Sequence, residues 1–254
     1  MEEATAGMTV TPAAAGSAPA APAGSKSLLA RVVGVWFSPR ATYADVAASP
    51  RWLGVLVLVG VLTGGATFAF MATEVGQQAW LDAAVRQQEA FGRTVTDQQY
   101  ERLQQFAVYA RYFAAAPVLV LPIVCAVVAA LMLGVFNALL GGDATFKQVF
   151  AIVAHSMALL PIAQAIGLPI AYVQGSLTGA TNLGVFAPFL DENSFAAHFV
   201  GALDLVYVWW LISLAIGLGV LYKRRTGAIA TSLLVTYGAI ALVVAAVRSA
   251  LSGA

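Results

Sequence analysis

Charged residues are scarce in this chain. Only 10% of its 254 residues are Asp, Glu, Lys or Arg, 60% are hydrophobic, and the mean hydropathy is +0.83. A water-soluble domain carries about 25% charged residues, so the composition excludes a soluble globular fold. The formal net charge of +1 provides no basic surface for nucleic acid, and we expect no nucleic-acid partner.

Cysteine and histidine are also rare. Cys125 is the single cysteine, which excludes an internal disulfide and a multi-cysteine metal site. The two histidines, His155 and His198, are far apart in the sequence. The motifs GxxxxGK, GxGxxG, HExxH and GxSxG, which mark common catalytic and nucleotide-binding sites, are missing. We therefore expect no catalytic residues, no metal site and no cofactor, and we do not expect an enzyme.

Long apolar runs dominate what is present. A helix of about 20 apolar residues crosses a hydrocarbon core of roughly 30 Å. The chain has five such runs, so we predict an all-α integral membrane bundle of five transmembrane helices with short interfacial helices. The expected spans are residues 52–72, 118–140, 146–172, 197–222 and 227–247.

Composition divides the chain into three regions. Residues 1–25 are rich in Ala and Pro and are expected to form a disordered tail. Residues 26–51 show apolar residues at helical spacing among cations, which predicts a cytoplasmic amphipathic segment at the membrane interface. Residues 52–252 form the five-span domain, in which the polar stretch 74–111 is expected to be an extracytoplasmic helical insert.

Several local signals mark helix ends and helix contacts. The pairs Thr96/Gln99 and Thr145/Gln148 match the capping box, and Ser-Pro pairs at 38–39 and 49–50 predict helix starts. Pro161 predicts a kink or break in the third span. In the first span, Gly60 and Gly64 are spaced so that another helix can approach closely, although glycine is also simply common in such helices.

The cations indicate the orientation. With the N-terminus inside, the inner side holds eight of them: Lys26, Arg31, Arg40, Arg51, Lys147, Lys223, Arg224 and Arg225. The outer side holds five: Arg86, Arg93, Arg102, Arg111 and Arg248. Because cytoplasmic loops carry the excess of Lys and Arg, we predict a cytoplasmic N-terminus and an external C-terminus.

Asp204 lies within the fourth expected span, where a carboxylate is costly and needs a partner. Counting 1.5 Å per residue from opposite membrane surfaces brings Asp204 and His155 to nearly the same depth. The candidate site is therefore a buried polar cluster of Asp204, His155, Ser156, Asn137 and Gln164. Three interpretations stay open: a hydrogen-bonded latch between the third and fourth spans, a proton or solute site, or an Asp204 that simply reaches the outer interface.

Three stretches carry a family resemblance. SPRATYADVAASPRW precedes the first span, GGDATFKQVFAIVAHSMALLP opens the third, and LDLVYVWWLISLAIGLG forms most of the fourth. Together they resemble the Yip domain family, multi-pass membrane proteins named for eukaryotic members that interact with Ypt/Rab-type small GTPases. The resemblance covers about residues 28–247 and implies a bundle of five helices with a cytoplasmic N-terminus. The polar insert and the Ala/Pro tail suggest a bacterial-type member in the plasma (inner) membrane, where the Rab partner has no obvious counterpart.

Two functions follow as hypotheses. The first is a non-enzymatic scaffold or membrane-organising protein that contacts the lipid bilayer and binds protein partners through the cytoplasmic N-terminal segment. The second is a small transporter or channel built around the Asp204 and His155 cluster. The sequence contains no signal for the oligomeric state.

Overall fold

The computed structural model describes residues 26–89, 92–177, 179, 181–191 and 194–252, and the expected tail 1–25 lies outside this range. Over these residues the fold is all-helical, as predicted, with one isolated bridge between Asn182 and Asp204. The helices are α1 (Leu28–Phe37), α2 (Pro39–Ala48), α3 (Leu53–Met71), α4 (Glu74–Glu89), α5 (Asp97–Ala110), η1 (Arg111–Ala115), α6 (Ala116–Leu133), η2 (Gly134–Leu139), α7 (Phe146–Ser156), η3 (Met157–Leu159), α8 (Leu160–Gln174), η4 (Leu183–Phe186), α9 (Phe195–Ala202), α10 (Leu205–Leu221) and α11 (Thr226–Ser252).

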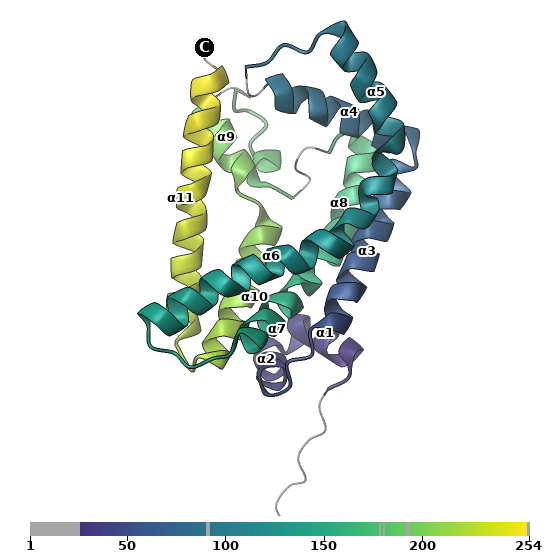
Figure 1. Cartoon of the computed structure of the whole chain (residues 1–254). Coiled ribbons are helices and arrows are strands. Elements are labelled where there is room, and N and C mark those ends of the chain that lie inside the picture. Colours follow the sequence, from purple (N-terminus) through teal and green to yellow (C-terminus); the bar gives the residue numbers. More distant parts are fainter. Residues whose placement is uncertain (1–25, 90–91, 178, 180, 192–193, 253–254) are drawn as a thin grey trace, which may run out of the picture.

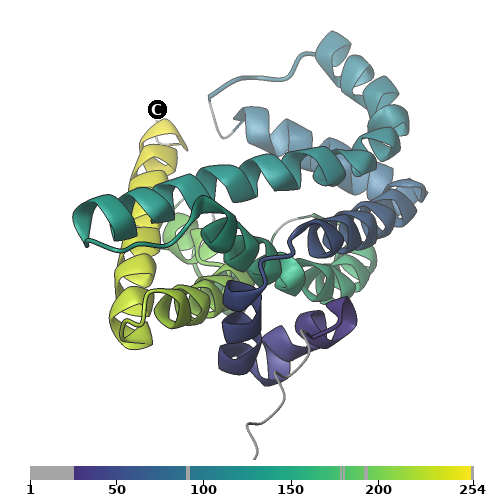
Figure 2. The same cartoon turned by 60° about the horizontal axis from the view of Figure 1, so that its bottom comes forward.

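The long helices run between the two ends of an elongated bundle (Figure 1). Four described segments are long and apolar enough to cross a membrane: Leu53–Met71, Asp97–Leu139, Phe146–Gln174 and Thr226–Leu251. The fourth expected span, 197–222, is not one helix, because the chain unwinds between α9 and α10. With its 17 residues α10 is at the short limit for a transmembrane helix. α1 and α2 lie at one end of the bundle, and the end of α11 lies at the other (Figures 1 and 2).

Helix starts were mostly predictable from local chemistry. Both capping boxes form: the Thr96 and Thr145 hydroxyls each accept from the backbone N–H three residues later, and each threonine backbone N–H donates to the glutamine side-chain oxygen. Pro39 begins α2 as expected, but the Ser38 side chain makes no capping bond. The helix start predicted at residues 49–50 is wrong: Ser49 ends α2, and α3 begins at Leu53.

The polar insert joins the second span without a break. α5 continues through the 3₁₀ turn η1 into α6 and the π-helical η2, so that residues 97–139 form one long helical segment. α6 crosses the bundle obliquely (Figures 1 and 2). η1 and the start of α6 come closest to α3 at its two glycines. A Cβ on Gly64 would lie 2.6 Å from the Ala114 carbonyl oxygen, and a Cβ on Gly60 would lie 3.2 Å from Val118 Cα. The close-approach interpretation of these glycines is confirmed.

The third span changes its helix type near the expected proline. α7 ends at Ser156, η3 forms one 3₁₀ turn, and α8 carries Pro161 in its first turn. Proline is tolerated there because the N–H groups of a first turn have no acceptor within the helix. Every residue of α7 from Val149 onward is buried. The main core surrounds α7 with side chains from α1, α2, α3, α6 and α10. A smaller cluster ties the far end of α3 to α4, α5 and α8.

Candidate functional site

A buried ion pair joins α1 to α2. Arg31 is only 2% exposed, and its Nε donates to Asp45 Oδ2 at 2.7 Å while its Nη1 donates to the Ser49 carbonyl at 3.0 Å. The other carboxylate oxygen of Asp45 accepts from the Lys26 backbone N–H, and Lys26 Nζ donates to the Thr42 hydroxyl. Arg31 Nη2 is buried without a hydrogen-bond partner in the described part of the chain. These bonds make α1 and α2 one unit, the N-terminal pair.

The N-terminal pair is docked on the bundle. Tyr43 of α2 is fully buried and its hydroxyl lies 2.7 Å from the Ser213 hydroxyl of α10. Gln148 Nε2 of α7 donates to the Ala47 carbonyl at 3.2 Å. Burial raises the pKa of Tyr43 above its ordinary value, although the bond to Ser213 acts in the opposite direction. A neutral tyrosine at this position keeps both hydroxyls satisfied inside the protein.

Aromatic and close contacts complete the docking. Trp36 of α1 meets Trp209 of α10 edge-on, with ring centroids 4.3 Å apart. Gly217 of α10 lies directly under the Tyr43 ring, because a Cβ there would be 3.0 Å from Tyr43 Cδ1 and 2.5 Å from Ile152 Cγ2. Packing and hydrogen bonding therefore fix the N-terminal pair against both α7 and α10.

His155 and Ser156 lie in the buried core at the end of α7. His155 Nδ1 is 2.8 Å from the Ala151 carbonyl oxygen, while its Nε2 has no partner among the described residues. The Ser156 hydroxyl donates to the Val153 carbonyl and accepts from Trp210 Nε1 at 2.9 Å. A polar link between the third and fourth spans therefore exists, and Trp210 provides its donor.

Asp204 is the N-cap of α10. Its Oδ1 accepts from the backbone N–H of Val206 at 2.7 Å and of Tyr207 at 3.3 Å. Its Oδ2 accepts from the Thr181 hydroxyl at 2.6 Å. A carboxylate at a helix N-terminus satisfies N–H groups that have no partner within the helix, and it is favoured by the helix dipole. Asp204 therefore lies at a helix start and is already hydrogen-bonded there.

The backbone around Asp204 is braced from two sides. Residues 203–205 pair in antiparallel fashion with residues 181–183 through hydrogen bonds of 2.8 and 3.1 Å. The Tyr237 hydroxyl of α11 accepts from the Asp204 N–H and donates to the Ala202 carbonyl, both at 2.9 Å. These bonds replace those that the unwound segment lacks, as an irregular backbone at membrane depth requires.

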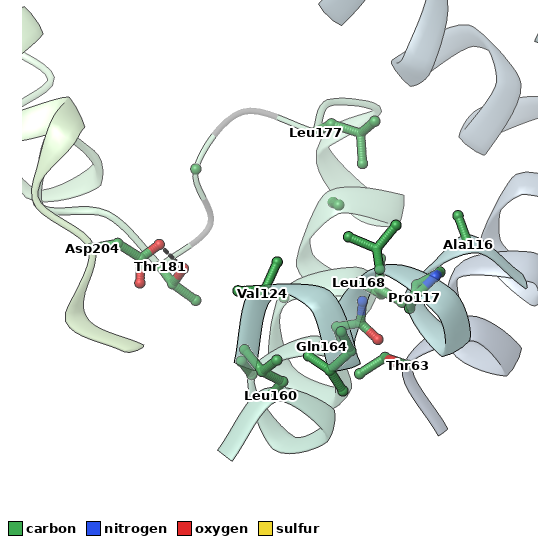
Figure 3. A pocket seen from close by; sticks show the side chains of 16 residues that line it. Thr63, Ala116, Pro117, Val124, Leu160, Gln164, Leu168, Leu177, Thr181 and Asp204 are labelled. Atoms are coloured by element: carbon green, nitrogen blue, oxygen red, sulfur yellow. Dashed lines mark hydrogen bonds between the residues drawn. The ribbon is translucent and has the colours of Figure 1, made fainter. Parts of the chain in front are cut away.

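Gln164 lies elsewhere, on a cavity between α3, α6 and α8. Its Nε2 donates to Thr67 Oγ1 at 3.2 Å, and its Oε1 is buried without a partner in the described residues. The cavity has a volume of about 620 Å³ and a mainly apolar lining. Figure 3 shows Gln164 beside Thr63 on one side and the Asp204–Thr181 hydrogen bond on the other.

Asn137 holds a turn at the end of the bundle where the N-terminal pair docks. Its Nδ2 donates to the Ala144 carbonyl at 2.8 Å, and its Oδ1 accepts from the Tyr222 hydroxyl at 2.9 Å. It thus ties the α6–α7 turn to the end of α10. It makes no hydrogen bond to any other member of the predicted cluster.

Comparison with known proteins adds one decisive match. A model of the Yip1 domain family matches residues 33–247. The chain belongs to the Yip1 domain family. Neither the search of curated proteins nor the search of solved structures gives a match. Family membership and the apolar helices together make the chain an integral, multi-pass membrane protein.

The five predicted site residues occupy three places in this Yip1 domain protein. His155 and Ser156 lie in the core, Gln164 and Asp204 line the cavity, and Asn137 holds the turn. No hydrogen bond joins His155 to Asp204 in the described chain. The depth count placed Asp204 inside a continuous helix. Trp210, which contacts Ser156, is six residues beyond Asp204, an offset of about 9 Å along α10.

The residues missed at the sequence level are the ones that dock the N-terminal pair. Arg31 was considered only as an interfacial cation and Asp45 was not singled out, yet the two form the buried ion pair that joins α1 to α2. Their spacing of 14 residues lies across a helix–turn–helix, so no periodicity within one helix reveals the pairing. Among the described residues, no three His, Cys, Asp or Glu side chains are grouped as metal ligands.

Proposed function

We propose that this Yip1 domain protein is a non-enzymatic membrane scaffold that binds a partner protein through its N-terminal pair. The observation that carries the proposal is an apolar stripe on α1. Leu29, Val33 and Phe37, spaced four residues apart, are 67%, 54% and 85% exposed. The opposite face of α1 carries the buried Arg31 and Val35. Residues four apart lie on one helix face, so the stripe points away from the bundle.

The docked state of the pair supports this role. Because the Arg31–Asp45 ion pair and the Tyr43–Ser213 bond hold α1 in place, the stripe is presented on a rigid support. A preorganised surface loses less conformational entropy on binding than a mobile helix does. Large apolar side chains at helical spacing are the anchors of helix-in-groove and helix-on-helix recognition.

We also propose that the end bearing the N-terminal pair faces the cytoplasm of a bacterial cell, with the C-terminus outside. The α6–α7 and α10–α11 turns lie at the same end as α1 and α2, whereas α4, α5 and the end of α11 lie at the other (Figure 1). The eight predicted inner cations thus belong to elements of one end and the five outer cations to elements of the other. This agrees with the excess of Lys and Arg in cytoplasmic segments.

Site-specific photo-crosslinking in the native membrane tests the scaffold function. A photo-reactive phenylalanine analogue placed at Val33 or at Phe37 is expected to give a protein adduct of discrete mass. The matched control is the same analogue at Val35, which is on the buried face of α1 and 4% exposed. Adducts with lipid alone at Val33 and Phe37 would refute the partner-binding role and favour a helix lying in the headgroup layer.

A second candidate, a small solute transporter, rests on the cavity beside Gln164. A volume of about 620 Å³ is within the range of small-molecule sites, and the unpartnered Gln164 Oε1 is an acceptor for a polar solute. Proteoliposome uptake would support this candidate if Gln164→Leu abolished it while a surface control, Gln104→Leu, did not. With no flux in the wild-type protein, the scaffold function stands alone.

A further inference from the structure

Two recesses adjoin each other at the end of the bundle where the N-terminal pair docks. One, of about 490 Å³, is lined by four cations and the first turn of α11: Arg40, Lys223, Arg224, Arg225, Thr226 and Gly227 are among its residues. The other, of about 540 Å³, is a mainly apolar groove between α6–η2 and α11. Arg224 and Arg225 line both recesses. A cationic recess therefore opens directly into an apolar groove.

The cations of the first recess lack counter-charges. Among the described residues these four cations form no ion pair, and neither recess has an acidic residue in its lining. Asp143, on the neighbouring α6–α7 turn, lines neither recess. Within the described part of the chain, Arg224 is the one of these four cations with a hydrogen-bonded side chain, which donates one N–H to the Leu140 carbonyl at 2.8 Å. The recess is thus strongly positive and has free donors.

The backbone of the α10–α11 turn places these cations at a cost. Lys223 has φ of 51°, in the left-handed region, where glycine is the usual residue after a helix end. The first N–H groups of α11, which have no acceptor within the helix, also belong to this turn and favour an anion. A lysine in place of the less strained glycine adds a positive charge beside these N–H groups.

The groove has the reach of one leaflet. From Arg225 to Thr236, its furthest residue along α11, are eleven residues, or about 16 Å of helix, roughly half of a 30 Å hydrocarbon core. Its hydroxyls do not make it polar, because Ser232 donates to the Ala228 carbonyl and Thr236 to the Ser232 carbonyl. α11 packs on α9 and α10, and the groove lies on its side toward α6, where it can take an acyl chain.

We propose that the two recesses form one binding site for an anionic phospholipid. The phosphate headgroup lies among Arg40, Lys223 and Arg225 at the start of α11, and an acyl chain lies in the groove between α6 and α11. Headgroup charge and chain length are both matched by the site, which distinguishes it from a simple phosphate site. The inference does not depend on the proposed partner protein.

Lipid titration of the purified full-length protein, read by native mass spectrometry, tests the site. Phosphatidylglycerol is expected to bind at least tenfold more tightly than phosphatidylcholine of the same chain length. The double variant Lys223→Gln/Arg225→Gln is expected to bind phosphatidylglycerol about 25-fold more weakly, from about fivefold for each cation removed. Neither side chain has a hydrogen-bond or ion-pair partner among the described residues, so we expect the fold to be retained. Arg40→Gln, with an expected loss of about fivefold, repeats the test in another helix.

Two matched controls make the outcome decisive. Arg93→Gln/Arg102→Gln removes the same charge at the other end of the bundle and is expected to leave binding unchanged. Ser232→Trp fills the groove and is expected to weaken binding, whereas Val235→Trp, on an exposed side of α11 outside the groove, is not. Equal binding of the two lipids, or an equal loss in the Arg93 control, overturns the site. Full competition by soluble glycerol phosphate, with no effect of Ser232→Trp, shows a free-anion site and also overturns the proposal.

Discussion

Replacing Asp45 with Ala removes the only counter-charge of a nearly buried arginine. Arg31 then keeps one hydrogen bond, to the Ser49 carbonyl, and two of its three guanidinium nitrogens are left without partners. Removing one member of a buried ion pair costs about 3–5 kcal/mol. Because the Asp45 side chain is 18% exposed, solvent screening places the expected cost at the lower end, about 3 kcal/mol.

This cost is expected to appear as undocking of the N-terminal pair. The pair packs on α7 and α10 but contains none of the long helices, so we expect it to open locally while those helices stay folded. Hydrogen–deuterium exchange measures this directly. A loss of about 3 kcal/mol predicts about a hundredfold faster exchange of the slowest amides in peptides from α1 and α2. Peptides from the C-terminal half of α11, which lies at the other end of the bundle, are the internal reference.

A double variant separates charge burial from loss of packing. Arg31→Met/Asp45→Leu replaces both charges by apolar groups of similar size and is expected to recover most of the protection, because no unpaired charge remains buried. If the pair instead lay solvated at the membrane surface, the bond would be worth about 0–1 kcal/mol. Two results would show that the reasoning is wrong. One is exchange in Asp45→Ala that is less than about fivefold faster than in the wild type. The other is a double variant whose α1 and α2 amides exchange as fast as those of Asp45→Ala.

Three smaller changes test other contacts. Tyr43→Phe is expected to cost about 1 kcal/mol of stability by leaving the Ser213 hydroxyl unpaired. Thermal unfolding should show that Ser213→Ala destabilises the Tyr43→Phe variant less than it destabilises the wild type. Asp204→Ala, which loses the N-cap of α10, is expected to cost about 1–2 kcal/mol and to be additive with His155→Gln within about 0.5 kcal/mol; a larger coupling would restore their predicted contact. Gly64→Ala forces α3 away from η1 and is expected to cost about 1–3 kcal/mol, with no loss of melting temperature as the contrary outcome.

Much of the fold could be predicted because it depends on local chemistry. Apolar runs long enough to span a bilayer, capping boxes at Thr96 and Thr145, and Pro39 at a helix start each act over a few residues. The break before α10 was missed because residues 197–222 read as one apolar run. Asp is a favoured N-cap residue, so Asp204 itself carried the signal for a helix start.

The candidate site was harder to predict because it is built by tertiary contacts. Arg31 and Asp45 are on different helices, and Tyr43 meets a serine 170 residues further along the chain. Sequence reasoning treats a cation in an amphipathic helix as solvated, which is right for most such helices. Here the helix is covered by α7 and α10, and the same charge becomes an interior one.

The separation between Tyr43 and Ser213 also sets an order of events during synthesis. The two residues are 170 positions apart, and at about 5–20 residues per second the ribosome needs roughly 10–30 s to reach the second after making the first. Throughout that interval α10 is not yet available for α2 to pack against, and the Tyr43 side chain stays exposed. The nascent chain therefore passes through a stage in which α1 and α2 are accessible to a chaperone, and this stage ends when α10 has been made.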